Sequence, residues 1–278
     1  MTQELQVLVN DEFIPTSKAA LLVSDLAIQR GYGIFDFCKT LHHTPVFLEE
    51  HLQRFIHSAA RLRLPVPPKE EIAAWIRQLM EKNNIPHSGI KLILTGGYSP
   101  DGYTISPPNL VITQIPIQPP APDAFEKGIR LITYPHIRQM PDIKTIDYLM
   151  AIWLQPYIRD KNADDVLYQR DGLVSECPRS NFFIVTKDDK VITPAENILK
   201  GVIRGKVLAL ARQIGPIEER PVSLDDIRNA REAFITSTTK HIVPVLQIDG
   251  QPIGDGLPGK ISRQLRQQLD ALVSSIVN

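Results

Sequence analysis

The sequence predicts two α/β domains joined by a proline-rich segment. Alternating or continuous apolar runs, typical of strands, recur between runs whose apolar residues have helical spacing. With 278 residues, of which 43% are hydrophobic and 22% charged, the chain suits one large domain or two smaller ones, each with a buried core. Four of the 23 prolines fall in IPIQPPAP. We therefore expect an N-terminal domain over 1–115, a linker over 116–123 and a C-terminal domain over 124–278.

The first domain is expected to begin with a hairpin over residues 5–15. An amphipathic helix follows over 48–63, because its apolar residues recur at helical spacing until PVPP ends it. A second helix begins near Lys69, with acidic residues in its first turn. The apolar runs GIKLILTGG and NLVITQIPI then predict two buried strands.

The second domain alternates strands with helices. After a strand at IRLITYPHI, the run TIDYLMAIWLQPYI predicts a helix whose apolar face carries Ile146, Leu149, Met150 and Trp153. Short strands separated by turns follow over 164–194. The remaining helices are expected at about 203–214, 223–230 and 258–275.

Charge and cysteine content narrow the class of protein. Lys+Arg and Asp+Glu both total 31, and this balance disfavours a dedicated nucleic-acid or membrane-surface binder. Cys38 and Cys177 have no metal-ligand spacing, and two cysteines do not make a disulfide framework. The start MTQELQVLVNDE does not resemble a signal peptide, and no apolar run reaches membrane-spanning length. We expect a soluble, cytoplasmic protein without a metal.

Lys144 is the first candidate for chemistry, because it lies between Ile143 and an apolar-striped run. Apolar surroundings lower the pKa of a lysine, and a neutral amine can attack an aldehyde to form a Schiff base. The alternative is an exposed lysine whose stem lies along the surface.

A candidate phosphate site lies in LKGVIRGKVLALARQIG, where Gly201 precedes an expected helix. The N–H groups of Val202 and Ile203 would have no partner within that helix, and such groups bind phosphate with help from the helix dipole. The alternative is a simple turn glycine.

Two further groups suit the same phosphate. TSTTKH follows the expected strand EAFI, so Thr238 and Thr239 offer N–H and O–H donors in a tight turn. Arg54, on the helix over 48–63, offers a bidentate countercharge. The alternatives are an ordinary Ser/Thr-rich turn and a solvated helix-face arginine.

Glu176, in VSECPRSNFFIV, precedes a proline and a buried strand, which is an unusual place for a carboxylate. A carboxylate held against a pyridine nitrogen keeps that nitrogen protonated and makes the ring an electron sink. The alternative is an exposed turn glutamate.

Taken in order, several motifs resemble one known family. These are RGYGIFDFCKT, FLEEHLQRF, IKTIDYL, SECPRSNFFIV, LKGVIRG and FITSTTKHIVPV. The chain resembles, over essentially its whole length, the fold-type IV (class IV) pyridoxal-phosphate-dependent aminotransferases, which include branched-chain and D-amino-acid aminotransferases and aminodeoxychorismate lyase. The resemblance implies a two-domain D-amino-acid aminotransferase-like fold with pyridoxal 5'-phosphate at the domain interface. It also implies a homodimer that acts on amino acids and 2-oxo acids.

The resemblance also assigns roles to residues of this chain. Lys144 would form the Schiff base and shuttle the proton, and Glu176 would pair with the pyridine nitrogen. Tyr148 would reach the ring hydroxyl. The phosphate would be bound by Arg54, by the N–H groups of Val202 and Ile203, and by the turn at Thr238 and Thr239. Ile203 stands where the family often has a threonine, so one hydroxyl contact, worth about 1 kcal/mol, would be lost.

Substrate recognition departs from the family pattern. D-amino-acid aminotransferases bind the substrate carboxylate with a tyrosine, an arginine and a histidine, and the matching positions here look like Phe35, Asp101 and Tyr103. That set is missing, and Asp101 would repel a carboxylate. Tyr32 resembles a tyrosine of the branched-chain enzymes. Arg138 and Arg179 are the remaining candidates for carboxylate recognition, with surface ion pairs as the alternative.

The expected function is an aminotransferase for branched-chain or other apolar amino acids. A D-amino-acid aminotransferase and a lyase that eliminates pyruvate from aminodeoxychorismate remain alternatives; the spacing from Lys144 to Asp147 resembles that of the lyase. From a different class, a cofactor-binding protein without turnover or a proline-rich interaction module also remains.

Overall fold

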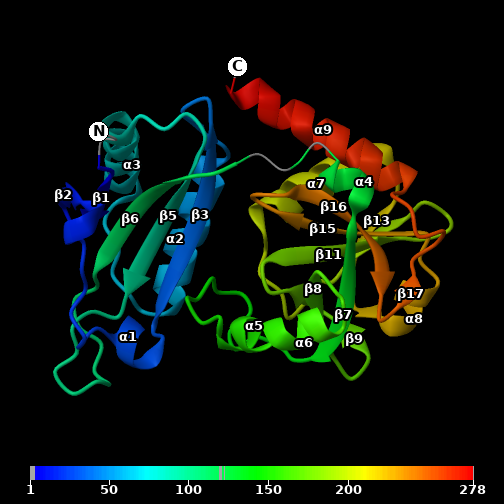
Figure 1. Cartoon of the computed structure of the whole chain (residues 1–278), viewed down its shortest axis with the longest axis horizontal. Coiled ribbons are helices and arrows are strands. Elements are labelled where there is room, and N and C mark those ends of the chain that lie inside the picture. Colours follow the sequence, from blue (N-terminus) through cyan, green and yellow to red (C-terminus); the bar gives the residue numbers. More distant parts are fainter. Residues whose placement is uncertain (1–3, 119–120, 122, 278) are drawn as a thin grey trace. The chain divides into compact units, whose positions relative to one another are not determined.

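The computed structural model describes residues 4–118, 121 and 123–277 (Figure 1). The chain divides into two compact units, and each is described by itself. Unit 1 contains the described part of Met1–Pro119, the segment Ile143–Asp147 and the end of the last helix, whereas unit 2 contains the described part of Pro120–Asp142 and Tyr148–Ser275. Within the described ranges, no helix is long and apolar enough to cross a membrane.

Unit 1 is built on a six-stranded antiparallel sheet in the order β2-β1-β6-β5-β3-β4. Its strands are β1 (Gln6–Val9), β2 (Glu12–Pro15), β3 (Gly33–Leu41), β4 (Thr44–Pro45), β5 (Ser88–Thr95) and β6 (Leu110–Pro116). The predicted hairpin at the N-terminus is confirmed, and Asn10 takes the left-handed conformation in its turn.

The helices of unit 1 are η1 (Thr16–Lys18), α1 (Leu26–Arg30), α2 (Leu48–Arg61) and α3 (Lys69–Asn83). Both long predicted helices are confirmed. α2 contributes Leu52, Phe55 and Ala59 to a core shared with the sheet, at the spacing that puts side chains on one helical face. The opposite, polar face of α2 remains exposed.

The segment Ile143–Asp147 differs from the prediction. The sequence pattern predicted a helix from Thr145, but these residues lie extended against β3, with Thr145 bridged to Ile34. Ile146 N donates to Gly33 O at 3.1 Å, so β3 satisfies main-chain groups that a helix would otherwise have paired internally. Lys144, expected in the C-terminal domain, therefore belongs to unit 1.

The predicted helix is also shorter and interrupted. It begins as α5 (Leu149–Trp153) and resumes as α6 (Gln155–Asp160) after Leu154. Only part of its apolar stripe faces a core, because Met150 packs against the cluster around Leu154 whereas Leu149 is 76% and Trp153 62% exposed. The predicted linker lies partly outside the described residues, since positions 119, 120 and 122 are not among them.

Unit 2 contains eleven strands, nine of them in the order β13-β12-β11-β15-β16-β7-β8-β9-β14. β7 is parallel to both β8 and β16, and β12 is parallel to β13. The strands are β7 (Ile129–Pro135), β8 (Asp165–Arg170), β9 (Leu173–Val174), β10 (Glu176–Cys177), β11 (Ser180–Val185), β12 (Val191–Thr193), β13 (Ile217–Glu219), β14 (Val222–Ser223), β15 (Glu232–Ser237), β16 (His241–Ile248) and β17 (Gln251–Pro252).

Besides α5 and α6, unit 2 contains α4 (Ala124–Lys127), α7 (Val202–Ile214), α8 (Leu224–Arg228) and α9 (Lys260–Val277). The three helices predicted in this region are confirmed, with ends that differ by no more than the usual one or two residues. Both carboxylate oxygens of Glu232, at the start of β15, accept from the N–H groups of Ile261 and Ser262 and so cap α9.

Candidate active site

Lys144 is held by its main chain on β3 and α2. Its carbonyl accepts from Phe35 N at 2.9 Å, and its N–H donates to Ser58 Oγ at 3.3 Å. The side-chain Nζ lies 4.5 Å from the centroid of the Phe35 ring. The Lys144 side chain is half-buried, and its Nζ lies over an aromatic face.

Arg54 makes a bidentate ion pair with Asp36, the residue after Phe35 on β3. Arg54 Nε donates to Asp36 Oδ2 and Nη2 donates to Oδ1, both at 2.8 Å. His51, one turn earlier on α2, lies 2.7 Å from the same carboxylate through Nδ1. This arrangement fixes the plane of the guanidinium, which has five N–H donors and uses two of them on Asp36.

Burial and neighbouring charges shift the pKa values of Asp36 and His51 in this network. Burial alone would raise the pKa of Asp36, but the Arg54 guanidinium and His51 hold it well below its usual range. Burial lowers the pKa of His51, an effect that the Asp36 carboxylate only partly offsets, and the positive charges of Arg54 and Lys144 lower it further. Near neutral pH the network therefore contains an ionised Asp36, a charged Arg54 and a neutral His51.

Glu176 in unit 2 is a buried carboxylate, 4% exposed, and not the exposed turn residue of the alternative interpretation. Arg138 donates to its Oε1 from both Nε and Nη2 at 2.8 Å. Its Oε2 accepts from Leu199 N at 2.9 Å and from Asn181 Nδ2 at 3.2 Å. Hydrogen bonds of this kind favour the ionised carboxylate.

α7 begins at Val202 with no side chain capping it, and Gly201 is the residue before its first turn. A Cβ at Gly201 would lie 2.2 Å from Asn181 Oδ1, so this position has room only for glycine. The uncapped N-terminus leaves the first N–H groups of a 13-residue helix for an anion. The side chains of Val202 and Ile203 are themselves buried.

The turn at Thr238, Thr239 and Lys240 connects β15 to β16. Thr236, two residues before Thr238, is paired with Asn181 across β15 and β11. Since Asn181 also contacts Glu176 and lies against Gly201, unit 2 groups the buried carboxylate, the helix N-terminus and the Thr-rich strand end. An anionic aromatic ligand with a basic ring nitrogen fits these donors and this carboxylate.

The proposed substrate residues have different surroundings. The Tyr32 hydroxyl donates to Leu62 O at 2.6 Å, and Phe35 lies under Lys144. Arg138 is committed to Glu176 and to Pro141 O, which supports its ion-pair alternative. Arg179 is exposed in the β10–β11 turn, and Tyr148 precedes α5 half-buried.

Asp101 organises its own loop. Its Oδ1 accepts from Ser99 Oγ, Tyr103 N and Thr104 N, and its Oδ2 accepts from Thr104 Oγ1 at 2.8 Å. The hydrogen bonds of Thr104 and Tyr103 lower the pKa of Asp101 well below its usual range. Asp101 is thus an ionised loop-forming residue, and the Tyr103 side chain is exposed.

Sequence reasoning missed Asp36, His51 and Asn181. A charged residue inside the apolar strand GIFDFC, and a histidine three residues before Arg54 on the same helical face, were the available signals for the first two. Asn181 had no such signal, because its role depends on the approach of Gly201 from a distant part of the chain.

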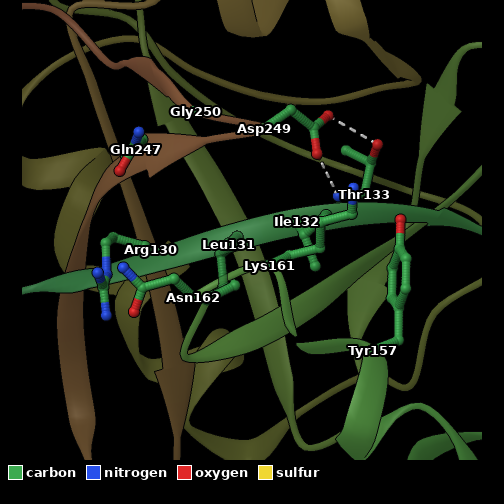
Figure 2. Close-up of a pocket in the computed structure, with 11 residues that line it drawn as sticks. Arg130, Leu131, Ile132, Thr133, Tyr157, Lys161, Asn162, Gln247, Asp249 and Gly250 are labelled. Atoms are coloured by element: carbon green, nitrogen blue, oxygen red, sulfur yellow. Dashed lines mark hydrogen bonds between the residues drawn. The ribbon is translucent and has the colours of Figure 1, made fainter. Parts of the chain in front are cut away.

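A pocket of about 510 Å³ in unit 2 lies elsewhere, beside β7 (Figure 2). Asp249 in this pocket accepts from Thr133 N and from Thr133 Oγ1, both at 2.7 Å, as Figure 2 shows. Arg130 is paired with Asp164. The pocket contains none of the predicted site residues, and within it Asp249 is engaged with Thr133.

Known proteins resemble the chain in both sequence and fold. Residues 33–248 match the family described as Amino-transferase class IV. The chain is 30% identical over 278 residues to the D-alanine aminotransferase of Bacillus licheniformis, an alignment that covers 98% of each protein.

Two solved structures of branched-chain aminotransferases share the fold over nearly the whole chain. The enzyme of Escherichia coli matches with a TM-score of 0.90 at 23% identity, over 99% of this chain and 97% of that chain. The enzyme of Thermoproteus uzoniensis, solved with norvaline, matches with a TM-score of 0.88 at 23% identity, over 98% and 96%. At such identities the structural likeness shows the fold, and it confirms the predicted fold class.

Proposed function

Because the chain belongs to the class IV aminotransferase family and is a pyridoxal-phosphate-dependent aminotransferase, we propose which of its residues carry the reaction and which substrates it takes. In this proposal Lys144 and Arg54 serve the cofactor together with Glu176, the α7 N-terminus and the Thr238–Thr239 turn. The reaction exchanges an amino group between an amino acid and a 2-oxo acid.

The observation that carries this proposal is the environment of Glu176. Both oxygens of its buried carboxylate are engaged, by an ion pair with Arg138 and by hydrogen bonds from Asn181 Nδ2 and Leu199 N, contacts that favour the charged form of a carboxylate. When bound, pyridoxal phosphate supplies an electron sink that stabilises a carbanion at the substrate Cα, provided that its ring nitrogen stays protonated. Glu176 supplies the anion that holds that proton.

Lys144 is the proton carrier. Its Nζ would attach the cofactor, and as a free amine it would accept the proton from the substrate Cα and release it in the next step. The main-chain bonds to Phe35 and Ser58 fix where the side chain starts. Arg54, oriented by Asp36, supplies the countercharge for the phosphate, and Val202 N and Ile203 N, with Thr238 and Thr239, supply hydrogen-bond donors.

The proposed substrates are amino acids with apolar side chains. The Phe35 ring, 4.5 Å from Lys144 Nζ, gives an apolar wall at the amine that meets the substrate Cα. Arg179 remains the candidate for the substrate carboxylate, since it is exposed whereas Arg138 is paired with Glu176. D-amino acids are the second candidate class, favoured by the 30% identity to a D-alanine aminotransferase.

The test is an absorbance titration of the cofactor-loaded protein with single L- and D-amino acids. The substrates are those that convert the cofactor to its aminated form, and a 2-oxo acid should restore the starting spectrum. Release of pyruvate from aminodeoxychorismate without a 2-oxo acid acceptor would instead identify the lyase. If Glu176→Gln bound the cofactor but retained the full rate of Cα proton exchange, the role of Glu176 would be refuted.

A homodimer is part of the same proposal. Its support is the exposed apolar surface of α5, where Leu149, Ile152 and Trp153 are each more than half exposed, since such patches mark interfaces. Sedimentation equilibrium tests it, and a monomer at micromolar concentration would contradict it. The free, buried Cys38 and Cys177 support a cytoplasmic location, which cell fractionation tests.

A further inference from the structure

α9 makes a set of contacts with the turn that carries Thr238 and Thr239. Arg266 donates from Nη1 to Ile242 O at 2.8 Å and to Lys240 O at 3.2 Å, the carbonyls on either side of His241. Asp270, one helical turn later, accepts from Arg266 Nε at 2.6 Å. The other Asp270 oxygen lies 2.6 Å from His241 Nδ1. We call Arg266, Asp270 and His241 the α9 clamp.

The clamp encloses a residue in the left-handed conformation. His241 has a φ of +58°, a region that few residues other than glycine adopt, although histidine is enriched there together with asparagine and aspartate. It follows a three-residue turn in a hairpin, a place where glycine commonly takes this conformation. Such a conformation persists when surrounding contacts over-determine it, and here a ring hydrogen bond and two carbonyl contacts do so.

The helix that supplies the clamp is itself anchored to the same strand. Glu232 caps the first turn of α9 from the start of β15, and the clamp joins the helix to the residues after the end of β15. Leu265 and Leu269 bury the helix face between these two attachments. α9 therefore provides a fixed base against which the turn is held.

We propose that Arg266 and Asp270 are positioning residues for the cofactor phosphate, which act by holding His241 in its left-handed conformation. This inference rests on the proposed function, in which the Thr238–Thr239 turn binds the phosphate. The clamp sets the direction of the N–H and O–H groups of the turn before the cofactor arrives, so binding does not require the turn to be ordered.

The chain offers a matched control on the same helix. Arg263 lies one turn before Arg266, but its guanidinium pairs with Glu126 and does not contact the turn. Arg266→Ala should raise the dissociation constant of pyridoxal phosphate about tenfold, the usual effect of losing a charge-assisted contact. It should also move the ³¹P resonance of the bound phosphate, whereas Arg263→Ala should change neither.

A double-mutant cycle tests the route through His241. Asp270→Ala alone should weaken cofactor binding about tenfold, but in a His241→Gly background its effect should fall below about threefold, because glycine adopts a positive φ without a clamp. Equal effects in both backgrounds would overturn the proposal. If Arg266→Ala does not fold, Arg266→Lys, which keeps the charge but loses the forked donor, replaces it.

A Thr238→Ala/Thr239→Ala variant separates the two proposals. If it shifts the ³¹P resonance while Arg266→Ala does not, the turn binds phosphate and the clamp proposal is wrong. If neither this variant nor Arg266→Ala changes the resonance or the affinity, the turn is not part of the phosphate site, and both this assignment and the clamp fail. A shifted ³¹P resonance in both variants, with an unchanged resonance in Arg263→Ala, supports the clamp.

Discussion

Asp36 and Arg54 are joined by two parallel hydrogen bonds of 2.8 Å, between a fully buried carboxylate and a guanidinium that is 11% exposed. A pair of this geometry orients the arginine as well as neutralising it. The proposed phosphate contact of Arg54 thus depends on a residue that itself has no role in binding the phosphate.

Asp36→Asn should destabilise the cofactor-free protein by about 3–5 kcal/mol, because it leaves a largely buried guanidinium without its partner charge. Urea unfolding measures this. The matched control is Glu49→Gln on α2, which breaks the exposed pair with Lys69 and should leave the stability unchanged within error. Equal losses in the two variants would contradict the importance of burial.

The neutral His51 predicts a pH dependence of stability. Burial holds its pKa in the folded protein below the ordinary 6.5, so on acidification the unfolded chain takes up a proton that the folded chain does not. The free energy of unfolding should therefore fall as the pH drops below about 6.5. The depressed pKa of Asp36 acts in the same direction, but only below its ordinary value near 4.

The slope of the free energy of unfolding against pH reports how many more protons the unfolded chain binds than the folded chain. His51→Asn should reduce that number by up to one between about pH 7.5 and 5.5. Denaturant titrations at three pH values measure it. His57→Asn is the control for replacing a histidine on α2, since His57 lies exposed on the same helix. A slope unchanged in His51→Asn would mean that other groups carry the proton uptake.

Lys144 and Lys91 provide a paired test of the catalytic lysine, because the Nζ atoms of both lie over the Phe35 ring, at 4.5 Å and 5.5 Å. Borohydride reduction of the loaded protein, followed by peptide mass analysis, should find the cofactor on Lys144. Lys144→Ala should lose that adduct and cost at least about 10³-fold in transamination rate, as expected when a covalent and acid–base group is removed. Label on Lys91 would reverse the assignment.

Gly201 and Gly205 lie one turn apart, and replacing each by alanine should have opposite effects. Gly201→Ala places a Cβ 2.2 Å from Asn181 Oδ1, so either Asn181 or the start of α7 must shift, and cofactor affinity should fall about tenfold. Gly205 has nothing within 4 Å of its Cβ position, so Gly205→Ala should stabilise the helix by about 0.5–1 kcal/mol and leave affinity unchanged. Thermal unfolding and cofactor titration of both variants check this.

Local pattern was sufficient for most elements of this fold. Apolar residues recur with a period of 3.6 in α2 and α7, and they form continuous runs in β5 and β6. These patterns reflect which face of each element is buried, so the order of apolar residues along the chain reveals the element directly. The run from Thr145 misled for a physical reason. Its apolar residues mimic a helix, but a distant strand supplies main-chain partners that the sequence pattern does not reveal.

The residues of the candidate site also differ in how far the sequence alone reveals them. Lys144, Glu176 and Gly201 stand out because each residue type is unusual in its immediate sequence. The contacts of Asn181 and Arg138 depend on what folds against them, so the sequence leaves Arg138 open between a substrate contact and an ion pair, and the structure pairs it with Glu176. Residues that act by orienting others are the harder class to find from sequence.

The extended segment Ile143–Asp147 has a consequence for synthesis. The edge of β3 that faces away from β5 accepts this segment, so unit 1 cannot be completed when its first 118 residues have left the ribosome. Until residue 147 emerges, that edge is an open template for strand pairing. A nascent chain stalled before that point should recruit chaperones, and an N-terminal fragment expressed alone should aggregate, unless the missing five-residue segment is supplied as a peptide.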